Sequence, residues 1–162
     1  MKDRGFTLLE LIITMGVMAF LIEVGVLSYT AVGRAMTSQV DELDSSWQTY
    51  RALSDIETDL REARLMITAG PASMSFWWKD LDGDTLVNPL TEVLTYSWDG
   101  TAGGDIVVSG ARSRVVARGI QNFALTYDSV VPATVKSATA QLTLQAGKKQ
   151  TTGEMTIMMR NK

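Results

Sequence analysis

The sequence predicts an α+β fold in which one long N-terminal helix packs on an antiparallel β-sheet. The first observation is that residues 6–70 contain no proline and carry apolar side chains at helical spacing. The second is that apolar and polar residues alternate from Ser73 onward, as they do in strands that bury one face. We therefore divide the 162 residues into a polar leader (1–5), an apolar helix (6–27), an amphipathic helix (28–67) and a sheet domain (68–162).

The apolar helix is long enough to cross a membrane. A helix of about 22 residues is roughly 33 Å long. This length is sufficient to cross the hydrocarbon core of a bilayer, which is about 30 Å thick. Glu10 and Glu23 are the only ionisable residues of the apolar helix, and Lys2 and Arg4 precede it. Basic residues ahead of a spanning helix favour a cytoplasmic N-terminus. Because a carboxylate at mid-bilayer costs about 2.5–3.5 kcal/mol, Glu10 is a candidate functional residue.

The hexapeptide Gly5-Phe6-Thr7-Leu8-Leu9-Glu10, which opens this helix, resembles the N-terminus of type IV pilins and type II secretion pseudopilins. The resemblance implies that a prepilin peptidase cuts between Gly5 and Phe6 and that the new N-terminus, Phe6, is methylated. It also implies that Glu10 pairs with the N-terminal amine of a neighbouring subunit, which relieves two charges that are each costly in lipid. An ordinary signal anchor is the alternative interpretation of the same segment.

The same resemblance implies partners and a location. The partners are the prepilin peptidase, other pilin or pseudopilin subunits and an inner-membrane assembly platform. The chain is expected to cross the inner membrane once, with its N-terminus in the cytoplasm and its C-terminal domain in the periplasm, and then to enter a pilus or pseudopilus. Residues 53–63 and 119–123 look like segments of J-type minor pseudopilins and related minor pilins, and Leu27 stands where many major pilins carry proline. These features favour a minor subunit. A major pilin, and the choice between pilus and secretion system, stay open.

The amphipathic helix is expected to lie with an apolar stripe against the sheet. We expect one helix from about Phe6 to Met66, ended by Gly70-Pro71. The stripe consists of residues three or four positions apart: Val32, Met36, Val40, Leu43, Trp47, Tyr50, Leu53, Ile56, Leu60, Ala63 and Ile67. Acidic and arginine side chains are interleaved at the other positions and predict a solvated, ion-paired surface.

The sheet domain is predicted from short runs in which every second residue is apolar. The runs are residues 73–79, 92–98, 106–109, 114–118, 123–127, 138–145 and 155–159. Residues 79–89 are expected to form a long hairpin loop, and Gly147–Gly153 a polar turn. The connections are too short for crossover helices, so the strands are expected to be antiparallel.

The long hairpin loop carries a candidate metal site. Asp80, Asp82 and Asp84 match the first three ligand positions of a calcium loop, and Asn88 and Glu92 could add further oxygen ligands. The match is incomplete, because Thr85 stands where a glycine belongs and Glu92 comes one residue late. A solvated turn rich in aspartate and glycine is the alternative. Calcium is therefore the one cofactor that the sequence suggests.

Composition excludes several classes of function. The formal charge is −3, and removal of residues 1–5 would leave −4, so general nucleic-acid binding is not expected. The chain has no cysteine for disulfides and no histidine to act as a general base near neutral pH. We therefore expect no enzyme, and the resemblance to pilins and pseudopilins implies a structural subunit. A membrane-tethered module that binds a surface, DNA or secreted cargo is the alternative.

Overall fold

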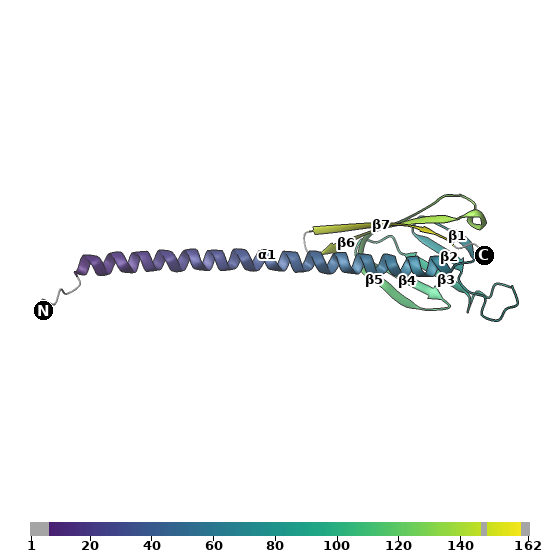
Figure 1. Cartoon of the computed structure of the whole chain (residues 1–162), viewed down its shortest axis with the longest axis horizontal. Coiled ribbons are helices and arrows are strands. Elements are labelled where there is room, and N and C mark those ends of the chain that lie inside the picture. Colours follow the sequence, from purple (N-terminus) through teal and green to yellow (C-terminus); the bar gives the residue numbers. More distant parts are fainter. Residues whose placement is uncertain (1–6, 147–148, 160–162) are drawn as a thin grey trace. The chain divides into compact units, whose positions relative to one another are not determined.

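The computed structural model of the chain describes residues 7–146 and 149–159 and confirms the predicted α+β class. The chain forms two compact units, residues 1–40 and 41–162. One helix, α1 (Leu8–Glu62), is followed by a seven-stranded sheet (Figure 1).

The first unit is the N-terminal part of α1. The helix begins at Leu8 because the Thr7 hydroxyl accepts a 3.3 Å hydrogen bond from the backbone N–H of Glu10, which is half of a capping box. Its best 18-residue window has a mean hydropathy of 2.2, so this helix is long and apolar enough to cross a membrane. The large apolar side chains between Leu8 and Val40 are exposed, so the fold gives them no cover.

The second unit contains the sheet, in which each strand pairs with the next in antiparallel fashion. Its strands are β1 (Leu65–Ala69), β2 (Ser73–Trp77), β3 (Val93–Trp98), β4 (Gly104–Gly110), β5 (Arg114–Tyr127), β6 (Ser137–Ala146) and β7 (Lys149–Met158), with a 3-10 turn, η1 (Pro132–Thr134), between β5 and β6. Threonine pairs link β6 to β7 on the polar face, at 2.9 Å for Thr139 and Thr156. The alternation read from the sequence therefore corresponds to one buried and one solvated face.

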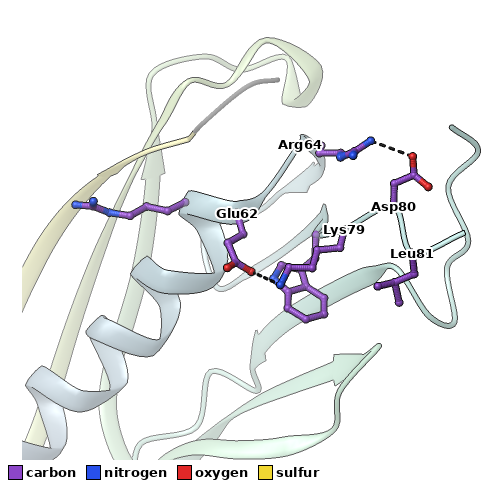
Figure 2. Close-up of a pocket in the computed structure, with 7 residues that line it drawn as sticks. Glu62, Arg64, Lys79, Asp80 and Leu81 are labelled. Atoms are coloured by element: carbon purple, nitrogen blue, oxygen red, sulfur yellow. Dashed lines mark hydrogen bonds and ion pairs between the residues drawn. The ribbon is translucent and has the colours of Figure 1, made fainter. Parts of the chain in front are cut away.

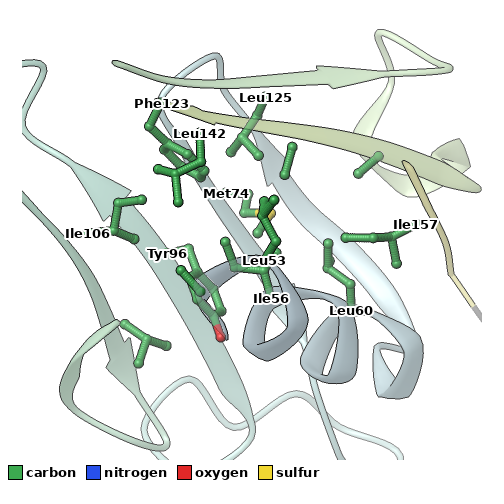
Figure 3. Close-up of a cluster of buried hydrophobic side chains, with 14 of the residues drawn as sticks. Leu53, Ile56, Leu60, Met74, Tyr96, Ile106, Phe123, Leu125, Leu142 and Ile157 are labelled. Atoms are coloured by element: carbon green, nitrogen blue, oxygen red, sulfur yellow. The ribbon is translucent and has the colours of Figure 1, made fainter. Parts of the chain in front are cut away.

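The core of the second unit lies between the sheet and the last three turns of α1. Leu53, Ile56 and Leu60 of the helix are at most 3% exposed. They join one buried cluster with side chains from every strand, among them Met74, Tyr96, Phe123, Leu142 and Ile157 (Figure 3). Burial of each such side chain contributes about 1.5–3 kcal/mol, so this cluster holds the helix on the sheet.

The predicted end of the helix is wrong. α1 ends at Glu62 and not at Met66, and residues 65–69 form strand β1. The Arg64 N–H donates a 2.8 Å hydrogen bond to the Trp77 carbonyl, and Met66 pairs with Phe76 across the strands. Pairing with β2 therefore replaces the next helical turn, although the apolar spacing of the sequence continues through Ile67.

The predicted apolar stripe is wrong in its first half. Trp47 and Tyr50 are 66% and 60% exposed, whereas Ser45, Thr49 and Ala52 face the sheet. The other exposed members of the predicted stripe are Val32, Met36, Val40 and Leu43 in its first half and Ile67 at its end. The cause is helical phase: repeated steps of three residues drift around the helix, so Trp47 lies on the opposite side of α1 from the buried Ile56. On its buried side the helix lies close to Gly153 of β7, where an added Cβ would lie 2.6 Å from Thr49 Cγ2.

Two strand boundaries also differ from the prediction. Residues 114–118 and 123–127 belong to the single strand β5, which bends at Gly119 (φ 69°), where the pairing registers on both sides shift. The left-handed conformation at Gly119 is the kind that a bulge requires and that glycine adopts without strain. Residues 149–153 were predicted to belong to a turn but form the start of strand β7, which begins at Lys149. The remaining residues of that predicted turn, Gly147 and Lys148, lie outside the described residues.

Candidate functional site

The first candidate site is the start of α1. Gly5 and Phe6 lie outside the described residues, and Glu10 stands in the first helical turn. Its neighbours Leu8, Leu9 and Leu11 are 76%, 68% and 53% exposed, so the carboxylate lies on an apolar surface. A negative charge in the first turn also interacts favourably with the helix dipole.

Glu10 and Glu23 take part in none of the ion pairs found among the described residues. Among the described residues Glu10 therefore has no cationic partner, and its carboxylate lies on a surface suited to lipid or to another helix. An unpaired carboxylate in such surroundings favours a cationic partner from outside the chain.

The second candidate site is the loop between β2 and β3. One carboxylate oxygen from each of Asp80, Asp82 and Asp84 lies within 4.8 Å of the others. Asp82 and Asp84 are exposed, and their Oδ1 atoms accept hydrogen bonds from the N–H groups of Asp84 (3.2 Å) and Leu86 (2.7 Å). The three predicted carboxylates are thus brought together by turns of the loop itself.

Glu92 does not join this cluster. Its carboxylate is buried and accepts hydrogen bonds from the N–H groups of Asn88 (3.0 Å) and Leu81 (2.6 Å). These two bonds, from Asn88 first and then Leu81, hold the pKa of Glu92 below its usual range. Asn88 uses its own side-chain oxygen to accept the N–H of Leu90 at 3.1 Å. In this structure Glu92 and Asn88 therefore organise the loop.

Thr85 adopts a positive φ of 64°. A β-branched residue rarely has this conformation, which calcium loops reserve for glycine at the same position. The backbone at Thr85 therefore turns as it does at the glycine of a calcium loop, although the residue is threonine.

An open pocket of about 310 Å³ lies between the end of α1 and the start of this loop (Figure 2). Its charged groups are paired: Arg64 lies 3.1 Å from Asp80, and Lys79 lies 2.8 Å from Glu62. The hydrogen bond from Lys79 holds the pKa of Glu62 below its usual value. Such pairs support the predicted ion-paired surface and provide no group poised for acid or base catalysis.

The ion pairs between α1 and the sheet were not specifically predicted. Asp59 is 4% exposed and binds both the Tyr96 hydroxyl and Arg112, while Asp55 lies 3.0 Å from Arg114. The sequence signal was weak, because the aspartates lie among other charged residues on a helix face that the sequence predicts to be solvated. Their arginines lie more than 50 positions further along the chain, so local spacing could not pair them.

One comparison with known families covers the segment that contains the first site. Residues 1–22 match the model of the prokaryotic N-terminal methylation motif. This motif marks type IV pilin-like precursors that prepilin peptidase processes. No curated protein and no solved structure matches the chain significantly. The N-terminal motif and the exposed apolar helix together fit a membrane-anchored structural subunit.

Proposed function

We propose that this chain is a minor pilin or pseudopilin subunit that assembles into, or primes, a type IV pilus or a type II secretion pseudopilus. In this proposal prepilin peptidase cuts between Gly5 and Phe6, and Phe6 is methylated. The observation that carries the proposal is the Glu10 carboxylate, which forms no ion pair with any described residue and lies within a matched methylation motif. The partners are the peptidase, other subunits of the filament and an inner-membrane assembly platform.

The function of Glu10 follows from electrostatics. A carboxylate and an ammonium group are each costly in lipid, but a close pair loses much of this cost. A subunit that supplies its N-terminal amine to Glu10 of a neighbour would therefore be drawn into register before it leaves the membrane. The apolar residues around Glu10 keep water away from this pair, which strengthens it.

The location follows from the same segment. Lys2 and Arg4 favour a cytoplasmic leader, so the unit of residues 41–162 would lie in the periplasm after insertion. Extraction into a filament would then move the apolar helix from lipid into contact with other helices. Both surroundings cover the apolar side chains that the fold leaves exposed.

Replacement of Glu10 by alanine tests the proposal. We expect Glu10→Ala to abolish filament assembly while the chain still inserts and folds. Glu23→Ala is the matched control, because it removes the other carboxylate of the same apolar segment, and it is expected to assemble. Normal assembly of the Glu10→Ala chain would contradict the proposal. It would favour the alternative, a binding module for a surface, DNA or cargo that the helix only tethers.

Mass spectrometry of assembled material gives a second test. The subunit is expected to begin with methylated Phe6. Polymerised chains that still carry residues 1–5 would be incompatible with the proposed maturation. The minor assignment, as opposed to a major pilin, is tested by the abundance of the chain relative to other subunits in purified filaments.

We also propose that Asp80, Asp82 and Asp84 bind calcium weakly, with Asn88 and Glu92 supporting the loop. The proximity of the three carboxylates and the turn at Thr85 favour it. Sites of this kind outside the cell have a Kd of about 10⁻⁴–10⁻³ M. Calorimetry of the full chain in detergent should detect heat at millimolar calcium, and the Asp82→Asn/Asp84→Asn variant should show none. No heat and no thermal shift in the parent chain would exclude the site.

A further inference from the structure

The loop between β2 and β3 presents aliphatic side chains to solvent. Leu81, Leu86 and Leu90 are 63%, 70% and 79% exposed. Each would gain about 1.5–3 kcal/mol from full burial, so their exposure on an ordered loop suggests a surface that is covered in an assembly. We call residues 80–90 the leucine loop.

The leucine loop is also acidic. Asp82 and Asp84 take part in none of the ion pairs found among the described residues, and Asp80 alone has a cationic neighbour, Arg64. A surface that covers the leucines must therefore be apolar in part and basic at its edge.

The same unit carries a surface of this kind. An open pocket of about 320 Å³ lies between α1 and β5. Its lining includes the apolar residues Val115 and Val116 and the cations Arg51, Arg114 and Arg118. Val115 is 40% exposed although it belongs to a strand. We call this the arginine pocket.

The charges of the arginine pocket are largely available. Asp55 is its one acidic lining residue and lies 3.0 Å from Arg114. The Arg118 side chain is 79% exposed, and its one ion pair with a described residue, Asp105, is long at 3.9 Å. Arg51 takes part in none of the ion pairs of the described residues. The pocket thus has three cations against one carboxylate, which complements the loop.

We propose that the leucine loop of one copy of this chain, when no calcium is bound to its carboxylates, docks in the arginine pocket of a second copy. Leucine side chains cover Val115 and Val116, while Asp82 and Asp84 face Arg51 and Arg118. The buried Glu92 carboxylate holds the N–H groups of Leu81 and Asn88, so the loop is ordered before it binds and loses less entropy.

The contact is heterologous, because loop and pocket are different surfaces. The loop begins beside Arg64, after the end of α1, whereas Arg51 lies about 16 Å further back along the helix from Glu62. Contacts of this type extend into open chains when they do not close into rings. This contact goes beyond the proposed function of Glu10, because it joins the units of residues 41–162 and uses no residue of the apolar helix.

Disulfide trapping between two copies tests the contact. The chain has no cysteine, so introduced thiols are the only ones. The full-length Leu86→Cys chain and the full-length Val115→Cys chain carry different tags and are co-expressed. The membranes are then treated with an oxidant in the presence of a chelator, which removes cations from the loop carboxylates. We expect a mixed disulfide between the two chains. Val130→Cys, whose parent residue is 98% exposed on another loop, replaces Leu86→Cys in the control and is expected to give little product.

Charge reversal gives the second measurement. Asp84→Arg on the Leu86→Cys chain should lower the yield about tenfold, because it places like charges together. Arg118→Asp on the Val115→Cys chain should restore it. Asp84→Arg also removes the hydrogen bond to the Leu86 N–H, so the restoration distinguishes charge pairing from a damaged loop.

Three results would overturn the contact: no mixed disulfide, a yield equal to that of the Val130→Cys control, or no restoration by Arg118→Asp. If the leucine loop is protected from thiol reagents without a mixed disulfide, a different protein or a lipid surface covers it. Filaments that form normally without the mixed disulfide would refute this contact and leave the function of Glu10 intact.

Discussion

The hydroxyl of Tyr96 on β3 donates a 2.5 Å hydrogen bond to Oδ2 of Asp59 on α1. The other oxygen of Asp59 accepts a hydrogen bond from Arg112, whose guanidinium lies 4.6 Å from the centroid of the Trp78 ring. Burial and the neighbouring Asp59 raise the pKa of Tyr96, so its hydroxyl keeps its proton. A buried carboxylate thus ties the helix to two parts of the sheet.

Removal of Asp59 should therefore destabilise the second unit strongly. Asp59→Ala leaves the Tyr96 hydroxyl and the Arg112 guanidinium without their acceptor, and we expect a loss of about 3 kcal/mol in the free energy of unfolding. Tyr96→Phe removes one hydrogen bond to a charged group and should cost about 2 kcal/mol. Urea unfolding of the full chain in detergent measures both.

Arg61→Ala is the control for this prediction. It breaks the exposed ion pair with Glu57, which measures 2.6 Å and should contribute about 0.5 kcal/mol or less. If Asp59→Ala proved no more destabilising than Arg61→Ala, the buried pair would not hold the helix on the sheet.

Gly153 sets how closely α1 approaches β7. Gly153→Ala would place a methyl group 2.6 Å from Thr49 Cγ2 and 2.9 Å from Leu53 Cδ1. Overpacking of this kind costs about 1–3 kcal/mol, so the variant should unfold at lower urea. Thr49→Ser removes the nearer methyl group but keeps the hydroxyl, which donates a 2.8 Å hydrogen bond to the Ser45 carbonyl. The double variant should regain part of the loss. Equal stability of Gly153→Ala and the parent chain would mean that the contact is looser.

The class of the fold could be predicted because two periods dominate the sequence. Leu53, Ile56 and Leu60 follow the helical period and are buried as expected. Leu142 and Leu144 follow the strand period and lie buried in β6. Each period predicts which residues share one face of a helix or strand. For these large apolar residues, the face predicted to be buried is the face that packs in the core.

The errors arose from helical phase and from long-range pairing. Trp47 is exposed because repeated steps of three residues drift around the helix, which places Trp47 on the opposite side of α1 from the buried Ile56. Strand β1 was missed because its hydrogen bonds go to β2 and not along the chain. At the candidate sites, local spacing predicted the grouping of Asp80, Asp82 and Asp84, whereas the pairing of Asp59 with Arg112 depends on long-range topology.

Because Trp47 is exposed, its replacement should have little effect on the free energy of unfolding, unlike the replacement of a tryptophan in the core. Trp47 stacks on Tyr50 with ring centroids 6.1 Å apart and is 66% exposed. Trp47→Gln should therefore change the free energy of unfolding by about 0.5 kcal/mol or less. Ile56→Ala, in the buried part of the same helix, should cost about 2–5 kcal/mol. A large loss for Trp47→Gln in the isolated chain would place this side chain in the core after all.

The connection between β5 and β6 should weaken in acid. The Asp128 carboxylate accepts hydrogen bonds from the backbone N–H groups of Ser137 and Lys136, which hold its pKa below the usual range. A carboxyl group with a lowered pKa stabilises the fold above its unfolded pKa of about 3.9, and this contribution is lost as the pH falls through the folded value. Asp128→Asn should therefore lower the free energy of unfolding at pH 7, and its difference from the parent chain should shrink as the pH falls below about 3.9. Hydrogen exchange at the Lys136 amide should increase in the variant at pH 7. A difference in stability that stays constant from pH 7 down to strong acid would show that the carboxylate charge does not contribute.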